Sequence, residues 1–145
     1  MLKDERVCLD CDPGWKFFKN SNTNTSKCYR YVTRKTDWAD AVKVCESESE
    51  HSSSMLASIP DQATNEFLYE LVASVNYEWT WTGGHQDSNA EWVWLDGSKI
   101  YWFNWFKGEP NDAGTNCLVF NYDGGFWADD SPTKFQRPLL CQYDP

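Results

Sequence analysis

The sequence has no long apolar run and few basic residues. No apolar stretch among its 145 residues approaches the length of a membrane-spanning helix, so we expect no membrane span. The 13 Lys and Arg residues are outnumbered by 22 Asp and Glu residues, which gives a formal net charge of −9. This balance argues against nucleic acid and anionic membrane surfaces as partners, because both attract clusters of basic side chains. The first residues are mostly polar and charged, unlike a signal peptide, and we expect Met1 to be an expression start on a mature fragment.

Histidine is scarce as well, which limits the metal sites that the chain can build. A zinc site needs four ligands, but the sequence has one Cys-x-x-Cys pair, Cys8 and Cys11, and its only histidines are His51 and His85. A thioredoxin-type pair lies between a strand and a helix, whereas a Pro-Gly pair follows here. The sequence therefore favours neither a zinc site nor a redox site.

No pattern in the sequence indicates an enzyme. Neither histidine occurs in an arrangement with a serine or cysteine that is typical of nucleophilic catalysis. Carboxylates are abundant, so composition alone leaves a glycosidase open, but no spacing places two of them across a cleft. We therefore expect a binding domain without catalytic activity.

Six cysteines are spread along the chain, from Cys8 to Cys141. In a small domain that is 17% aromatic, such cysteines indicate a disulfide framework and an oxidising compartment. Asn24 begins an Asn-Thr-Ser triplet, an acceptor sequence for glycosylation. The sequence thus predicts a secreted or extracellular protein.

Regular elements are predicted mainly in the first half of the chain. Residues 15–33 alternate in polarity around a polar turn at 20–26, which is typical of a β-hairpin. Thr36 or Asp37 can cap a helix, whose apolar face we expect to contain Trp38, Ala41, Val42 and Cys45. A second helix is predicted from Pro60-Asp61, with apolar residues at helical spacing: Ala63, Phe67, Leu68, Leu71, Val72 and Val75.

The second half is dominated by aromatic residues and turn formers. Residues 83–117 show little periodicity, and short strands are predicted near 118–120, 126–127 and 139–141. The most informative stretch is 101–111, an aromatic cluster that runs into a Glu-Pro-Asn turn.

The Glu-Pro-Asn turn places a carboxylate, Glu109, and a carboxamide, Asn111, on either side of Pro110. A proline peptide can be cis, and a cis bond here would direct both side chains toward the same side. Two converging oxygen groups suit calcium. Because Glu accepts hydrogen bonds and Asn also donates them, the pair could bind vicinal hydroxyls of a sugar.

The order of these motifs resembles the long form of the C-type lectin-like domain. The resemblance runs from Cys11 to Cys141 and predicts a domain at 11–145 after an N-terminal extension at 1–10. It implies an α+β fold with two helices, small antiparallel sheets and a long irregular loop region. The motifs that carry it are Cys11-Asp-Pro-Gly-Trp15, Cys28-Tyr29, Trp81-Thr-Gly-Gly84, Trp92-x-Trp94-x-Asp-Gly-Ser98, Asn104-Trp105 and Gly108-Glu-Pro-Asn111.

The resemblance also implies the disulfide pairing. It pairs Cys11 with Cys28, and Cys45 with Cys141. A third bridge of the family would join Cys117 to a cysteine further on, but residues 118–140 contain none. Cys8 and Cys117 are thus left over, and the sequence leaves open whether they pair, stay reduced or link chains into an oligomer.

By the same resemblance, Glu109, Asn111 and Asp129 are predicted to bind Ca²⁺ and sugar. Asn116 can add a carbonyl oxygen, because Thr115-Asn116 stand where the family has an acidic residue. The family's Trp-Asn-Asp motif is incomplete here: Ala128 replaces its asparagine, and Asp130 is a candidate substitute. Three acidic residues stand where some members bind an auxiliary calcium ion, although a solvated loop is the simpler interpretation: Asp87, Glu91 and Asp112.

The function implied is calcium-assisted binding of mannose-type glycans, which carry mannose, N-acetylglucosamine, glucose or fucose. In the family, preference for galactose goes with a Gln-Pro-Asp turn, which is absent. The alternative is a calcium-independent domain whose long loops bind a protein or another surface, with Glu-Pro-Asn kept only as a turn. Five tryptophans are expected in the core: Trp15, Trp38, Trp81, Trp94 and Trp127. Three aromatic residues lie nearer the turn and are candidates either for stacking on a sugar or for burial under the loops: Trp102, Trp105 and Phe106.

Overall fold

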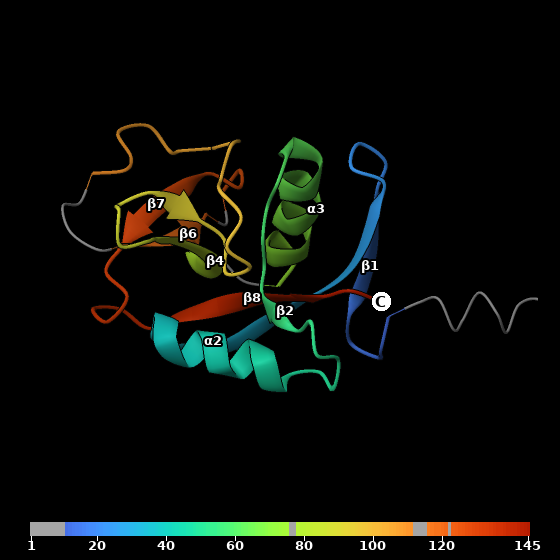
Figure 1. Ribbon diagram of the computed structural model, residues 1–145. Coiled ribbons are helices and arrows are strands. Elements are labelled where there is room, and N and C mark those ends of the chain that lie inside the picture. Colours follow the sequence, from blue (N-terminus) through green and yellow to red (C-terminus); the bar gives the residue numbers. More distant parts are fainter. Residues whose placement is uncertain (1–10, 76–77, 112–115, 122) are drawn as a thin grey trace, which may run out of the picture.

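A β-hairpin begins the described part of the chain. The computed structural model describes residues 11–75, 78–111, 116–121 and 123–145, and element labels follow Figure 1. Strand β1 (Lys16–Asn20) pairs antiparallel with β2 (Thr25–Thr36), as the alternation at 15–33 predicts. The turn between them is exposed and carries Asn24.

Two helices follow, and an aspartate caps each of them. The Asp37 carboxylate accepts a hydrogen bond from the Asp40 amide (2.9 Å) at the start of α2 (Trp38–Ser47). The Asp61 carboxylate does the same for Thr64 (3.0 Å) before α3 (Gln62–Ala73). These caps satisfy amide groups that a helix start leaves without intrahelical partners. The predicted apolar face of the second helix extended two residues too far, since the helix ends at Ala73 and Val75 is 57% exposed.

An eight-stranded sheet connects the hairpin to the second half of the chain. Its main path runs β1-β2-β8-β4-β6-β7, while β3 pairs with β8 and β5 with β4. Strand β8 lies antiparallel to β2 and parallel to β4, so it joins the N-terminal and C-terminal halves. The remaining strands are β3 (Met55–Leu56), β4 (Thr80–Gln86), β5 (Trp92–Val93), β6 (Cys117–Phe120), β7 (Trp127–Asp130) and β8 (Arg137–Tyr143).

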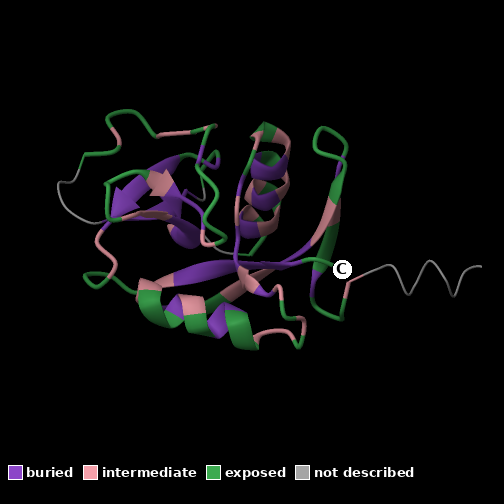
Figure 2. Ribbon diagram, in the orientation of Figure 1, coloured by how far each residue is buried: buried purple, intermediate pink, exposed green. Residues whose placement is uncertain are grey.

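The two helices cover opposite sides of the central strands β2 and β8 (Figure 1). Cys141 belongs to the core cluster that contains Ala41 of α2, and Leu140 belongs to the cluster that contains Leu68 of α3. Successive side chains of a strand point to opposite faces, which explains why neighbours in β8 serve different clusters. Figure 2 shows β8 buried along most of its length.

Four of the five tryptophans expected in the core are buried: Trp15, Trp81, Trp94 and Trp127. Trp38, in the first turn of α2, is only half-buried, and its indole nitrogen donates to the Thr82 carbonyl (2.9 Å). The prediction that Trp38 lies in the core was therefore only partly correct.

Two disulfides close this frame. Cys11 is bonded to Cys28 and Cys45 to Cys141, as the resemblance implies. The second bond joins α2 to β8 across 96 positions of sequence. Cys117 is a buried free thiol, and burial raises its pKa to about 12. The predicted role of Cys8 lies outside the described residues.

Candidate functional site

The Glu-Pro-Asn turn stands at the end of a loop that is fixed to strand β7. The Glu109–Pro110 peptide bond is cis, the possibility that the sequence left open. The Glu109 amide donates to the Phe106 carbonyl (2.9 Å), and the Phe106 amide donates to the Trp127 carbonyl (2.7 Å). The turn is therefore held through Phe106 to the first residue of β7.

Trp127 itself is held by several parts of the molecule. Its amide donates to the Asn104 carbonyl (2.8 Å), and its indole nitrogen donates to the Asn65 carboxamide on α3 (2.8 Å). The rings of Trp102 and Trp105 pack edge-on against it. Trp102 and Trp105 are half-buried, which favours burial under the loops over stacking on a sugar, whereas Phe106 is 44% exposed.

Asp129 brings together three of the four residues that the sequence predicts as ligands. One of its carboxylate oxygens accepts a hydrogen bond from the Asn111 amide (3.0 Å), and the other accepts one from the Asn116 carboxamide (3.0 Å). Asp129 and Asn116 are buried, whereas Asn111 is exposed. Glu109, the fourth residue, is half-buried and lies two positions before Asn111. The cluster thus has a buried base and an exposed rim.

A residue that the sequence did not single out anchors Asn116. The Gln86 side chain at the end of β4 accepts from the Asn116 amide (3.2 Å), and the Gln86 amide donates to the Asn116 carbonyl (3.1 Å). No local pattern marks Gln86, since its role depends on β4 lying beside β6 in the sheet.

The two residues flanking Asp129 are used elsewhere. Ala128 is buried in the core cluster that contains Val119, and its side chain offers no oxygen. One oxygen of the Asp130 carboxylate, Oδ2, accepts from both Nε (2.8 Å) and Nη2 (2.7 Å) of Arg137, and the other, Oδ1, accepts from the Ser131 amide (3.1 Å). Asp130, a candidate substitute for the missing ligand, is thus engaged by Arg137.

Two of the three acidic residues expected at an auxiliary calcium position, Asp87 and Glu91, lie in one hydrogen-bonded turn. The Asp87 carboxylate accepts from the amides of Asn89 (2.8 Å) and Glu91 (3.0 Å), and Glu91 pairs with Lys99 (3.0 Å). This arrangement agrees with the simpler interpretation of a solvated loop. Asp112 and Thr115 lie outside the described residues.

The chemistry of the cluster suits a hard cation in kind but offers few ligands. Its members are two carboxylates and two carboxamides, the oxygen groups that calcium prefers. Within the described residues, no group of three or more His, Cys, Asp or Glu side chains could hold a metal ion. Any cation here would therefore depend on the carboxamide oxygens as well.

Among the described residues, no helix is long and apolar enough to cross a membrane.

The fold and this loop architecture define a class of small α+β recognition domains. The Lectin C-type domain family matches residues 34–143, and the chain belongs to this family. Members of this family are carbohydrate-binding proteins rather than enzymes, in agreement with the expectation from the sequence.

Known proteins give the same assignment. The chain is 29% identical over 141 residues to the galactose-specific lectin nattectin of Thalassophryne nattereri, covering 94% of this chain and 82% of nattectin. It is 34% identical over 130 residues to ladderlectin of Oncorhynchus mykiss, covering 83% of this chain and 63% of ladderlectin. Among solved structures, the C-type carbohydrate-recognition domain of cow CD23, determined in the presence of a GlcNAc2Man3 oligosaccharide, superposes with a TM-score of 0.77 at 26% identity, covering 95% of this chain and 98% of that one.

Proposed function

We propose that this domain is an extracellular lectin that binds mannose-type glycans with the assistance of calcium. The observation that supports it best is the contact of Asp129 with both Asn111 and Asn116, next to the Glu109–Pro110 turn. The two disulfides support the extracellular location, because such bonds persist in oxidising compartments.

Each residue of the cluster has a distinct part in this proposal. Glu109 accepts a hydrogen bond from one sugar hydroxyl, while the Asn111 carboxamide donates to the neighbouring hydroxyl. Asp129, buried and held by Asn116, provides the fixed negative charge at the base of the site. Calcium, held by the side-chain oxygens of these four residues, would coordinate both sugar hydroxyls. Because calcium takes 6–8 oxygen ligands, we expect water and the sugar to complete its shell and its affinity to be modest.

The test of calcium is a thermal unfolding experiment with the ion and with a chelator. A ligand that binds only the folded state raises the midpoint of unfolding, so we expect a higher midpoint at millimolar calcium. Asp129→Asn should abolish this rise, whereas the matched control Asp40→Asn, an exposed carboxylate in α2, should retain it. An equal midpoint of unfolding with and without calcium would contradict the proposal that the site binds calcium.

The order of the Glu-Pro-Asn turn is the basis for proposing mannose-type rather than galactose-type ligands. The name of nattectin shows that a galactose-specific lectin occurs among the relatives. A glycan array that tests the proposal must therefore include both mannose-type and galactose-type sugars. Exchanging the two groups with Glu109→Gln and Asn111→Asp should move binding from mannose-type toward galactose-type glycans, because it exchanges donor and acceptor positions. Identical profiles for the parent and the double variant on a glycan array would refute the assignment.

A second candidate is calcium-independent binding of a protein surface by the long loops. It is favoured by the engagement of Asp130 with Arg137 and by the burial of Ala128, which leave the cluster short of ligands. The thermal experiment separates the two candidates, since this one predicts no calcium effect.

A further inference from the structure

The turn of the β1–β2 hairpin carries a modification motif that the function proposed above does not use. Asn24, Thr25 and Ser26 form an Asn-x-Ser/Thr triplet, the acceptor sequence for N-linked glycosylation. No other asparagine of the sequence has a serine or threonine two positions further on. Asn24 is therefore the single candidate for this modification.

Asn20 anchors the turn from inside the molecule. Its carboxamide nitrogen donates to the Asp61 carboxylate before α3 (2.9 Å), and its carboxamide oxygen accepts from the Asn22 amide (2.9 Å). Asn20 is 3% exposed, whereas residues 21–25 are all exposed, as Figure 2 shows. Asn24 thus lies on a turn that is fixed at its base and open to solvent.

The backbone explains an asparagine at position 24 but not the residue two positions later. The φ angle of Asn24 is 54°, in the left-handed region, which asparagine adopts more readily than most residues. Ser26 instead lies in β2 and pairs with Lys19 of β1. Strand pairing uses backbone groups, so it requires no hydroxyl at this position. The fold therefore accounts for Asn24 alone and not for the combination that the acceptor sequence needs.

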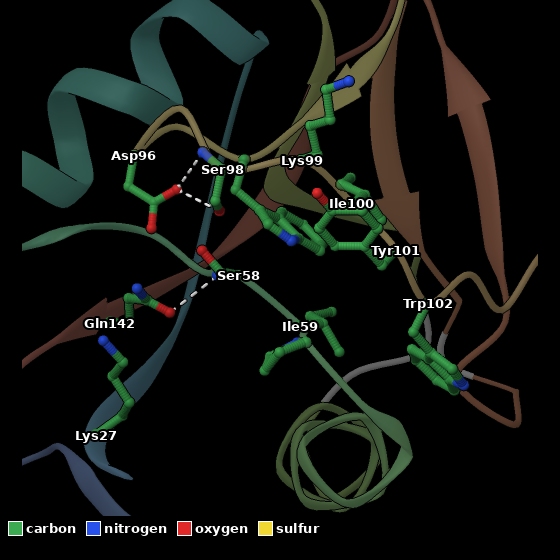
Figure 3. Close-up of a pocket in the computed structure, with 12 residues that line it drawn as sticks. Lys27, Ser58, Ile59, Asp96, Ser98, Lys99, Ile100, Tyr101, Trp102 and Gln142 are labelled. Carbon is green, nitrogen blue, oxygen red and sulfur yellow. Dashed lines mark hydrogen bonds between the residues drawn. The ribbon is translucent and has the colours of Figure 1, made fainter. Parts of the chain in front are cut away.

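The nearest cavity gives Ser26 no role either. Lys27, the next residue of β2, lines a cavity of about 220 Å³ together with Ser58 and Gln142 (Figure 3), and it pairs with Asp144. Successive side chains of a strand point to opposite faces, so the Ser26 side chain does not point into this cavity. Packing and ion pairing explain Lys27, whereas they leave Ser26 to the acceptor sequence.

The disulfides of the domain agree with this modification. Cys11–Cys28 and Cys45–Cys141 are both formed, and such bonds form in oxidising compartments such as the lumen of the endoplasmic reticulum. Asparagine-linked glycans belong to surface loops of proteins on the same secretory route. The bonds are thus evidence for this compartment that does not depend on the triplet.

A glycan on Asn24 lies apart from the Glu109 cluster. Figure 1 shows the hairpin turn on one side of α3 and the long loop, residues 87–111, on the other side. Segments that are separated in one view are also separated in space. The modification therefore leaves the Glu109 cluster open.

We propose that Asn24 is an N-glycosylation site and carries one N-linked oligosaccharide. The donor is an oligosaccharide linked to a lipid diphosphate. The Asn24 Nδ2 atom forms a bond to C1 of the first sugar and loses a proton, while the bond from C1 to the diphosphate oxygen breaks and the lipid diphosphate leaves. The transferase recognises the Ser26 hydroxyl as part of the acceptor sequence. This site goes beyond the function proposed above and stands whether or not that function is correct.

The experiment is secretion of the whole chain from animal cells, behind a cleavable signal peptide, followed by mass spectrometry. The parent should carry a glycan on the tryptic peptide 20–27, and peptide-N-glycosidase should remove it and leave an aspartate at position 24. Ser26→Ala should abolish the modification, whereas Ser26→Thr should retain it, because threonine also supplies the hydroxyl. Asn22→Gln is the matched control: it changes an exposed asparagine of the same turn that is no acceptor, and the glycan should stay.

Asn24→Gln should abolish the modification as well. Because glutamine suits the left-handed region less well, Ser26→Ala, which keeps Asn24 in place, is the more direct test. A secreted, disulfide-bonded parent without a glycan overturns the proposal. A glycan that persists in Ser26→Ala or Asn24→Gln, or that is lost in Asn22→Gln, also overturns it. The measurement involves neither calcium nor sugar binding, so its failure is distinct from a failure of the proposed function.

Discussion

The regular frame and the long loop of this domain are stabilised in different ways. The frame, which consists of β1, β2, α2, α3 and β8, is held by strand pairing, helix caps and two disulfides. The long loop, residues 87–111, contains only the short strand β5 and depends on side chains that contact Trp127. Local sequence patterns therefore predict the hairpin and the helices of the frame, but not how the loop packs.

One residue of the frame connects the two regions. Asn65 of α3 accepts from the Trp127 indole (2.8 Å) and donates to the Gly125 carbonyl (2.9 Å). The same carbonyl accepts from Asn104 in the long loop (2.8 Å). The loop that carries Glu109 is thus positioned from the helix, through Trp127.

The largest expected effect falls on the frame. Replacing both Cys45 and Cys141 by alanine opens a link across 96 positions, which in the chain-entropy account costs about 4–5 kcal/mol of unfolding free energy. Urea unfolding of the parent and the double variant measures this loss. A midpoint that stays the same would show that the frame does not depend on the bond.

Breaking the connection between the regions should have a smaller effect on stability and a selective effect on the loop. Asn65→Ala leaves the buried Trp127 indole without its acceptor, at a cost of about 1–3 kcal/mol, while Asn104 still satisfies Gly125. We expect glycan binding to weaken as well, because Trp127 positions the Glu109 turn. Gln62→Ala, an exposed change on the same helix, is the control and should alter neither property. Unchanged binding in Asn65→Ala would mean that the loop is positioned independently of the helix.

The smallest effect is expected at Cys117, which lies on β6 between the two regions. Because burial raises its pKa to about 12, the thiol is protonated at pH 8 and should resist alkylation in the folded protein. Mass spectrometry should detect alkylation of Cys117 only after unfolding, together with intact 11–28 and 45–141 bridges. A peptide that links Cys8 to Cys117 would contradict this and would place the N-terminus beside the loop.

The sequence predicted the hairpin and both helices because their signals are local. Alternating polarity at 15–33 and the capping residues Asp37 and Asp61 act within a few positions of the chain. The sequence allowed a cis peptide bond before Pro110, since proline permits it, but the structure shows that the bond is cis. The disulfide pairing, by contrast, came from the resemblance to a family.

What the sequence alone determined is the Glu-Pro-Asn turn and its two oxygen groups, Glu109 and Asn111, whereas Asn116 and Asp129 became candidates through the resemblance to a family. Only the tertiary structure decided how they are used, because β6 and β7 lie side by side and bring Asp129 to Asn116. The same pairing of distant segments engaged Asp130 with Arg137, and it brought Gln86 to the site. A carboxylate has the same chemistry at position 129 and at position 130, and the partner that the fold places beside each one determines its role.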